Sequence, residues 1–255
     1  MTWNPRQYLK FASHRLRPAL DLIARIDLVA PRSICDLGCG TGAITQILAD
    51  RWPDASITGV DESSAMLEQA AMEHPERAWR QQRIAEWEPD EPVDLIFSNA
   101  ALHWLGDHAT LFPKLMDGLV PGGVLAVQMP RNFDAPSHTL IAETARTGAW
   151  SGKLEHLLGP SPTAAPSVYH GLLAPRSASL DIWETEYLQV LTGPDPVKEW
   201  TKGTWLMRFL EVLEPEERSA FEADYARRLQ LAYPTQAGGE TLFPFRRLFL
   251  VAQKP

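Results

Sequence analysis

The stretch Ile34-Cys35-Asp36-Leu37-Gly38-Cys39-Gly40-Thr41-Gly42 decides the fold of this chain. A short apolar run leads to an acidic residue and then to three alternating glycines, and residues 43–48 then read as a helix. This order predicts a strand, a tight turn and a helix N-terminus. Glycine has no Cβ atom, so the turn can adopt positive φ and a ligand can approach its backbone closely. The free N–H groups of the first helical turn face an anionic or polar group, which suits a cofactor with an adenosine end and a charged end.

The glycine pattern by itself is compatible with more than one kind of site. Gly38-x-Gly40-x-x-Ala43 satisfies the dinucleotide pattern, and Asp61 lies about twenty residues further on, where a ribose-binding acid belongs. A nicotinamide-dependent oxidoreductase is therefore one interpretation, and a turn that binds nothing is another. Three alternating glycines are costly unless something must come close, so a ligand-binding loop is favoured.

Composition limits the possible partners. The 255 residues suffice for one large domain or for a core domain with an insertion, and 45% apolar residues are ordinary for a soluble globular enzyme. The net charge of -8 argues against nucleic acid or an anionic membrane as a main partner. No apolar run approaches the ~18 residues of a transmembrane helix. The first residues have no signal-peptide pattern, so a cytoplasmic location is expected.

The two cysteines, Cys35 and Cys39, lie in the first strand and the glycine loop. Their spacing is not Cys-x-x-Cys, and no second Cys/His pair is near. Free thiols in a reducing compartment are therefore expected, with neither a disulfide nor a metal site.

Strands and helices alternate as far as residue 130, which predicts a doubly wound α/β sheet. Beyond residue 130 prolines become frequent, and two late strands are separated by about fifty mostly helical residues. The expected strands are residues 33–36, 56–61, 79–84, 93–99, 124–129, 180–191 and 248–252; the expected helices are a helix begun by Pro18 and residues 41–50, 63–74, 111–119, 140–150 and 195–228.

These elements predict a core interrupted by insertions. Residues 1–30 form an N-terminal helical segment or lid, and residues 31–130 form the cofactor-binding core. Residues 131–178 and 192–242 form helical insertions over the substrate, and residues 179–191 and 243–255 return as the final strands of the core sheet.

Four further features follow successive strands, at the edge where open α/β sheets bind ligands. They are Asp61 after the second strand, Arg83-Ile84 after the third, Asn99 after the fourth and Met129-Pro130 after the fifth. Together with the glycine loop, these segments resemble the class I S-adenosylmethionine-dependent methyltransferases. The resemblance implies a Rossmann-like sheet of about seven strands, mostly parallel with an antiparallel last strand. The segments are Val60-Asp61, Arg83-Ile84-Ala85-Glu86-Trp87, Phe97-Ser98-Asn99-Ala100-Ala101-Leu102-His103-Trp104, and the Pro121-Gly122-Gly123 turn before the fifth strand.

The resemblance also implies roles for individual residues. Asp61 would accept hydrogen bonds from the ribose hydroxyls, although it could simply cap the helix near Ser63. Many members of the class place an Asp at the adenine amino group where this chain has Arg83, which cannot accept a hydrogen bond. The remaining cofactor residues would be Asp36, Gly38, Gly40, Thr41 and Gly42 around the methionyl part and ribose, Met66 near the adenine, the backbone of Ile84 and Ala85 at the adenine, and Asn99 and Ala100 below the sulfonium.

A narrower resemblance runs from residue 3 to about residue 252. Its segments are Trp3-Asn4-Pro5, Tyr8-Leu9, Arg15-Leu16-Arg17-Pro18, Asn99 to Trp104, Val127-Gln128-Met129-Pro130 and Phe245 through Ala252. They resemble the branch of this class that methylates trans-aconitate. This resemblance implies a small polycarboxylate as substrate, which is already ionised at neutral pH, so no general base is required. The alternatives are another small acid, a hydroxyl compound, or a protein that binds the cofactor without catalysis. The expected substrate-binding residues are Tyr8, Arg15, His103, Trp104, Tyr169, His170 and Arg247, of which His103 and Trp104 could equally be packing residues.

Overall fold

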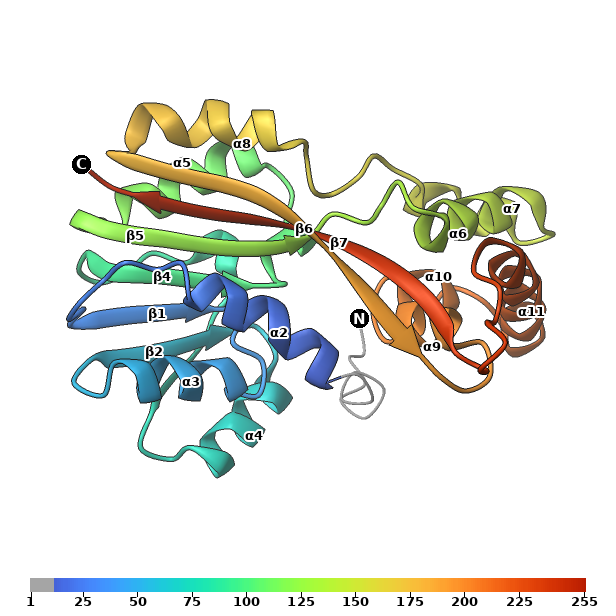
Figure 1. Cartoon of the computed structure of the whole chain (residues 1–255), viewed down its shortest axis with the longest axis horizontal. Coiled ribbons are helices and arrows are strands. Elements are labelled where there is room, and N and C mark those ends of the chain that lie inside the picture. Colours follow the sequence, from blue (N-terminus) through green and yellow to red (C-terminus); the bar gives the residue numbers. More distant parts are fainter. Residues whose placement is uncertain (1–11) are drawn as a thin grey trace. The chain divides into compact units, whose positions relative to one another are not determined.

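The computed structural model describes residues 12–255, with side chains from Leu16 onward. Its centre is a seven-stranded sheet with the strand order β3-β2-β1-β4-β5-β7-β6 (Figure 1). This order confirms the predicted doubly wound α/β class. The strands are β1 (Ser33–Leu37), β2 (Ser56–Asp61), β3 (Ala78–Gln81), β4 (Val93–Asn99), β5 (Leu119–Pro130), β6 (Ser179–Leu191) and β7 (Thr241–Gln253).

The strand directions bring the chemistry to one edge. Parallel pairing joins β3 to β2, β2 to β1, β1 to β4 and β4 to β5. The last strand, β7, pairs with β5 in the antiparallel direction, as predicted. The order changes direction at β1, with β2 on one side and β4 on the other, and a ligand crevice forms at such a point outside the carboxyl ends of the strands.

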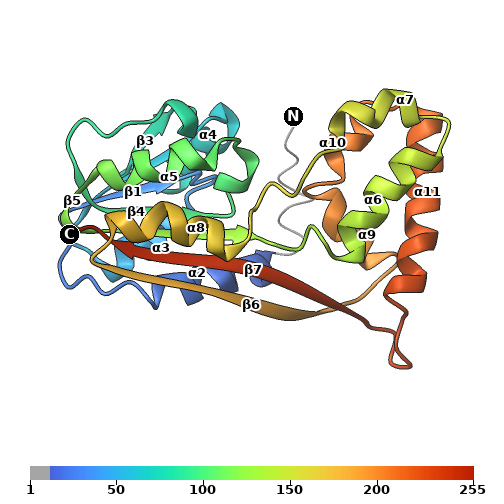
Figure 2. The same ribbon diagram turned by 90° about the horizontal axis from the view of Figure 1, so that it is seen from above.

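Helices cover both faces of this sheet. Figure 2 shows α2 (Ala12–Ile23) and α3 (Ala43–Arg51) below the strands, and α5 (His108–Asp117) and α8 (Pro166–Leu173) above them. The buried side chains of β1, β4, β5 and β7 form one core cluster with those of α5 and α8. The remaining helix of this part is α4 (Ser64–Glu73), whose N-cap is Ser63, as predicted.

Several predicted boundaries differ from the structure. Pro18 does not begin α2 but lies inside it. Proline there removes one helix hydrogen bond and crowds the preceding turn, which is why the sequence predicted a helix start at this residue. The third strand ends at Gln81, since Ile84 belongs to a short 3-10 helix, η1 (Ile84–Glu86). The fifth strand begins before its Pro-Gly-Gly turn, at Leu119. The ends of these helices and strands depend on contacts with distant parts of the chain, so the local sequence does not predict them.

The chain divides into two compact units. One consists of residues Leu16–Pro130, Pro162–Thr185 and Arg247–Pro255, and the other includes Arg131–Ser161 and Glu186–Arg246. The predicted insertion over residues 131–178 therefore extends too far, because α8 belongs with the sheet. Tyr169 of α8 packs on Phe112 of α5, with ring centroids 5.0 Å apart. Both β6 and β7 contribute residues to each unit.

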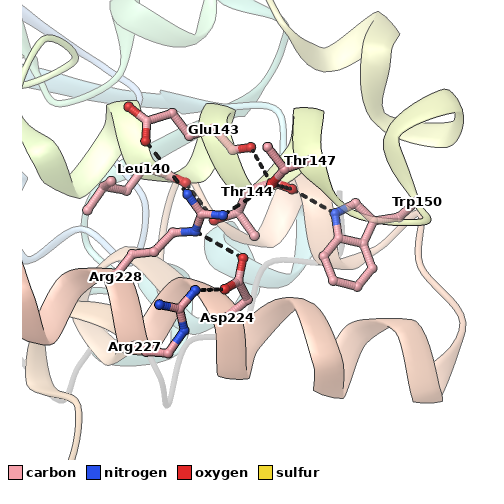
Figure 3. Close-up of polar contacts among 8 residues, drawn as sticks. All are labelled: Leu140, Glu143, Thr144, Thr147, Trp150, Asp224, Arg227 and Arg228. Atoms are coloured by element: carbon pink, nitrogen blue, oxygen red, sulfur yellow. Dashed lines mark hydrogen bonds and ion pairs between the residues drawn. The ribbon is translucent and has the colours of Figure 1, made fainter.

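The second unit has its own core of apolar helix faces and aromatic rings. In Figure 3 Arg228 donates a hydrogen bond to Asp224 at 2.9 Å and another to Thr147 at 3.2 Å, which joins α11 to α6. The indole of Trp150 donates to the carbonyl of Thr144 at 2.9 Å, so it fixes the end of α6. Within residues 131–246, the α-helices of this unit are α6 (Pro136–Thr147), α7 (Ser151–Leu154), α9 (Pro196–Lys202), α10 (Met207–Leu210) and α11 (Pro215–Ala232).

Candidate functional site

The glycine loop between β1 and α3 adopts the backbone that its sequence predicts. The φ angles of Gly38, Gly40 and Gly42 are +78°, +55° and +81°. The backbone amides of Gly38 and Cys39 both donate to the carbonyl of Val60, at 2.8 and 3.1 Å. These bonds hold the loop against the end of β2, so its backbone conformation is set before any ligand binds.

The three glycines have different surroundings. A Cβ atom on Gly38 would collide with Ala101, and one on Gly42 would lie 2.5 Å from the indole of Trp79. A Cβ atom on Gly40 would meet no atom of the described residues within 4 Å. Gly38 and Gly42 are thus required by packing within the protein, whereas the space beside Gly40 is open to a ligand.

Asp36 is buried at the end of β1. Its Oδ2 accepts a hydrogen bond from the Thr45 hydroxyl at 2.6 Å, which ties the strand to α3. Burial raises the pKa of Asp36 to about 7; the Thr45 hydrogen bond opposes that rise and the nearby charge of Asp61 adds to it. A cationic group bound beside Asp36 would favour its ionised form.

Asp61 is shared between the loop and α4. Its Oδ2 accepts from the amide of Gly40 and its Oδ1 from the amide of Ser63, each at 2.9 Å. The bond to Ser63 helps to fix the start of α4, where Ser63 is the N-cap residue. Each carboxylate oxygen can accept a further hydrogen bond, so the local role leaves capacity for a ribose diol.

The segment after β3 supplies the predicted adenine-side residues. Ile84 lies close to the glycine loop, since a Cβ atom on Gly38 would be 3.5 Å from its Cδ1. Ile84 and Ala85 open the helix η1, whose first amides have no partner within the helix. Arg83 is largely exposed and pairs with Glu86 at 3.2 Å, so its side chain points away from this position. Met66 is buried in the first turn of α4.

The end of β4 carries backbone strain. Ala100 has a φ of +54°, a conformation that non-glycine residues rarely adopt and that clusters at functional sites. Its amide donates to the carbonyl of Gln128 at 2.9 Å, which holds the chain in this bend. The side-chain oxygen of Asn99 is buried and accepts no hydrogen bond from the described residues. A buried acceptor of this kind suits a ligand that brings its own donor.

Arg247 and Gln128 form a buried polar pair on adjacent strands. Arg247 of β7 is 4% exposed, and its Nη1 donates to Oε1 of Gln128 at 3.2 Å. Gln128 stands in register with Asn99 on β4, whereas its partner in register on β7 is Phe249. Arg247 is opposite Pro130, two residues from Phe249, and reaches Gln128 diagonally. Sequence reasoning selected Arg247 but missed Gln128, and the signal for it was a lone glutamine in an otherwise apolar buried strand.

The remaining predicted substrate residues lie in different surroundings. His103 is buried and Trp104 half-buried in the short helix η2 (Leu102–Trp104), with ring centroids 4.6 Å apart. Tyr169 is fully buried in the core: its hydroxyl lies 2.8 Å from Nδ1 of His108 and accepts from the amide of Ala164 at 3.1 Å. His170, the next residue of α8, is exposed. Tyr169 therefore packs α8 onto α5, a role that the sequence did not indicate.

Two predicted substrate residues remain outside the described side chains. Tyr8 falls before the first described residue, and Arg15 belongs to α2 with a side chain that is not described. Their predicted contacts with substrate stay predictions.

The two thiols are buried and free, as expected. Burial, reinforced by the adjacent Asp36 carboxylate, raises the pKa of Cys35 to about 11 and that of Cys39 further still. Neither thiol is therefore a nucleophile at neutral pH. Residues 12–255 contain no group of three His, Cys, Asp or Glu side chains placed to hold a metal ion. Within the same range, every helix is too short or too polar to cross a membrane.

These observations fit a nucleoside cofactor with a charged amino-acid end. The open space beside Gly40, the carboxylate of Asp61 and the unsatisfied oxygen of Asn99 all belong to the sheet-containing unit. The close approach of Gly38 to Ala101, and the 2.8 Å bond from the Ser98 hydroxyl to the carbonyl of Leu37, join the loop to the end of β4. The predicted cofactor residues thus form one continuous region.

Comparison with known proteins decides between the cofactor classes. The family model described as a methyltransferase domain matches residues 34–123. A trans-aconitate 2-methyltransferase from Azoarcus sp. is 47% identical over 251 residues, which is 98% of this chain and 98% of that relative. The chain belongs to the trans-aconitate 2-methyltransferase family. The nicotinamide interpretation of the glycine loop was therefore wrong, and the predicted resemblance is confirmed.

Solved structures of other methyltransferases share the fold of this family member. A putative methyltransferase from Bacillus halodurans has a TM-score of 0.61 at 14% identity, covering 94% of this chain and 99% of its own. A phosphoethanolamine N-methyltransferase from Haemonchus contortus, solved with S-adenosylhomocysteine, has a TM-score of 0.55 at 15% identity. That match covers 94% of this chain and 52% of the other. At these identities the likeness concerns the fold alone.

Proposed function

We propose that this protein transfers the methyl group of S-adenosylmethionine to a carboxylate of trans-aconitate, giving the monomethyl ester. The observation that carries the proposal is the identity of 47% to a named trans-aconitate 2-methyltransferase along nearly the whole of both chains. The buried Arg247 on the strand next to β5 supports an anionic acceptor. A guanidinium matches a carboxylate with two parallel hydrogen bonds, so it suits a non-reacting carboxylate of the acid.

The cofactor supplies an electrophilic methyl group on a sulfonium. Asp61 is proposed to accept hydrogen bonds from the ribose hydroxyls while it keeps the loop in place through Gly40. Asp36 favours the positively charged end electrostatically, and Met66 with the backbone of Ile84 and Ala85 is proposed to hold the adenine. Asn99 has an acceptor oxygen available for an ammonium group.

The chain needs no general base for this reaction. A carboxylate is ionised at neutral pH because its pKa is near 4. The remaining task is to align the carboxylate oxygen with the methyl carbon and to exclude water, and positioning of this kind can supply on the order of 7–11 kcal/mol. Arg247 is proposed to hold a carboxylate that does not react. A strong contact to the attacking carboxylate would slow the reaction, since that group loses its charge as the ester forms.

The test is a panel of small acids incubated with the protein and S-adenosylmethionine, read by mass spectrometry for a gain of one methyl group. We expect trans-aconitate to be methylated with a higher kcat/KM than dicarboxylic acids of similar length. Arg247→Gln should lower kcat/KM for trans-aconitate by about 2–5 kcal/mol equivalent while cofactor affinity stays unchanged. Turnover of a hydroxyl compound with none of the acids modified would refute the proposal.

A different small acid is the alternative that the site also accommodates. The guanidinium of Arg247, which Gln128 contacts, suits a carboxylate without specifying how many others the acid carries. The same panel separates these acids, because a second carboxylate subsite makes the preference for a trianion large. The predicted cytoplasmic location stays a prediction.

A further inference from the structure

Gln128 lies between the proposed cofactor residues and the proposed acceptor residue. It stands in register with Asn99 on β4. On its other side, Oε1 accepts from Arg247 at 3.2 Å. On β7, Arg247 is opposite Pro130, two residues from the residue that pairs with Gln128, so the two side chains meet as diagonal neighbours. Gln128 is the side chain through which the two halves of the site meet.

The orientation of the Gln128 amide follows from its partner. Arginine carries only donors, so the group that faces Arg247 must be the amide oxygen. The NH₂ group is then directed away from the guanidinium. Gln128 is 0% exposed, and this nitrogen donates to no atom of the described residues.

A buried donor without an acceptor calls for an explanation, because the amide has lost its hydration without a replacement. The side chain could be leucine if it only filled space in an apolar strand. Its neighbours in β5, Val127 and Met129, are buried apolar residues of that kind. Glutamine at this position has a side-chain donor that an anionic or carbonyl oxygen of a bound ligand can accept.

We propose that Gln128 is a specificity-determining residue of the acceptor site. Its Oε1 fixes the orientation of the Arg247 guanidinium, and its Nε2 donates to a carboxylate of the acid that this guanidinium binds. Arg247 and Gln128 together thus recognise one carboxylate that does not react. The inference rests on the proposed function, since it names the group that binds a polycarboxylate acceptor.

The proposal predicts different effects for two substitutions of Gln128 whose side chains are similar in size. Gln128→Leu removes both hydrogen bonds without adding a charge. Gln128→Glu keeps an acceptor for Arg247 but replaces the donor with a second anion, which repels the acid and competes for the guanidinium. The Glu variant should therefore bind the acid less well than the Leu variant, an order that a packing role does not predict.

The experiment measures KM and kcat for trans-aconitate, and calorimetric Kd for S-adenosylhomocysteine, in the wild type and both variants. We expect KM to rise about threefold to tenfold in Gln128→Leu and more than tenfold in Gln128→Glu, with Kd for the cofactor product within about twofold. The matched control is Gln253→Glu, the same change on β7 opposite Val124, at the far end of the β5–β7 pair. It should leave KM unchanged.

The outcomes distinguish the two proposals. If the wild type methylates none of the acids, the proposed function fails and this inference fails with it. If the wild type methylates trans-aconitate while both folded Gln128 variants keep its KM, only the role of Gln128 is refuted. If both variants weaken cofactor binding by the same factor as they raise KM, Gln128 has a structural role, and the proposed specificity role is refuted. Circular dichroism at the assay temperature establishes that each variant is folded.

Discussion

Asp61 and Gly40 are joined by a hydrogen bond from the glycine amide to the carboxylate Oδ2, 2.9 Å long. The other oxygen of Asp61 accepts from the amide of Ser63. One side chain therefore connects the glycine loop to the start of α4. Local structure and ligand binding depend on the same carboxylate, so its substitution is informative only when both are measured.

Replacing Asp61 with alanine should weaken S-adenosylmethionine binding by ~1.5–3 kcal/mol, the usual contribution of hydrogen bonds to a charged group. Calorimetry measures the affinity, and thermal unfolding without cofactor measures the loss of the Gly40 and Ser63 contacts. Asp61→Asn is the matched variant, because it keeps an acceptor for one amide but has no charge. Unchanged affinity in folded Asp61→Ala would remove this residue from the cofactor site.

Substitutions in the glycine loop should separate packing from ligand space. Gly40→Val should fold, because a Cβ atom there meets no other atom of the described residues within 4 Å. The φ of +55° adds strain of ~1–2 kcal/mol. The branched side chain should fill the space beside the loop and abolish cofactor binding. Gly38→Ala provides the contrast, since its Cβ atom would collide with Ala101 and the fold itself should suffer. Normal cofactor binding by folded Gly40→Val would contradict the location of the ligand.

Asp36 should make stability depend on pH. Burial raises its pKa to about 7, so between the unfolded value near 4 and this value the folded state holds more protons than the unfolded chain. The free energy of unfolding should therefore fall as pH rises through this window. Asp36→Asn cannot ionise, so without cofactor it should be more stable than the wild type at pH 8, by about 1–4 kcal/mol. The difference should narrow toward pH 5.

Urea unfolding at pH 5 and pH 8 measures this difference in the absence of ligand. The Asn side chain keeps an acceptor for Thr45, so loss of that bond does not obscure the result. A variant that is less stable by the same amount at both pH values would mean that Asp36 is ionised throughout.

The rate of methyl transfer should be flat above neutral pH. A carboxylate acceptor is fully ionised in this pH range, so the reaction does not depend on deprotonation of a general base. The value of kcat should therefore change less than about twofold between pH 7 and 9. Below that range kcat/KM should fall as the acid is protonated. Methylation of a hydroxyl group would instead need a base, and a steep rise between pH 7 and 9 in the stable protein would count against a carboxylate acceptor.

Tyr169→Phe should affect stability and not catalysis. The variant leaves Nδ1 of His108 and the amide of Ala164 without the hydroxyl that they contact, at a cost of ~0.5–1.5 kcal/mol in free energy of unfolding. Both KM for trans-aconitate and kcat should stay within about twofold of the wild type. A large rise in KM with unchanged stability would return Tyr169 to the substrate site.

The elements of the sheet were predictable because their signals are local. The second and fourth strands match their predicted ranges. The second strand ends in an acid before a helix start, and the fourth is a nearly continuous apolar run. The first strand and the glycine loop were predictable for a stronger reason. Positive φ at three alternate positions requires glycine, so the residue type itself reports the backbone conformation.

The sequence by itself determined the fold class, the conformation of the glycine loop and the position of Asp61 after the second strand. Three further findings needed the tertiary structure: Tyr169 is a core residue that contacts His108, α8 belongs with the sheet, and Gln128 accepts a hydrogen bond from Arg247. The physical reason is sequence separation. Backbone conformation and strand formation depend on neighbours a few residues away, whereas Gln128 and Arg247 are brought together only by the antiparallel pairing of β5 with β7.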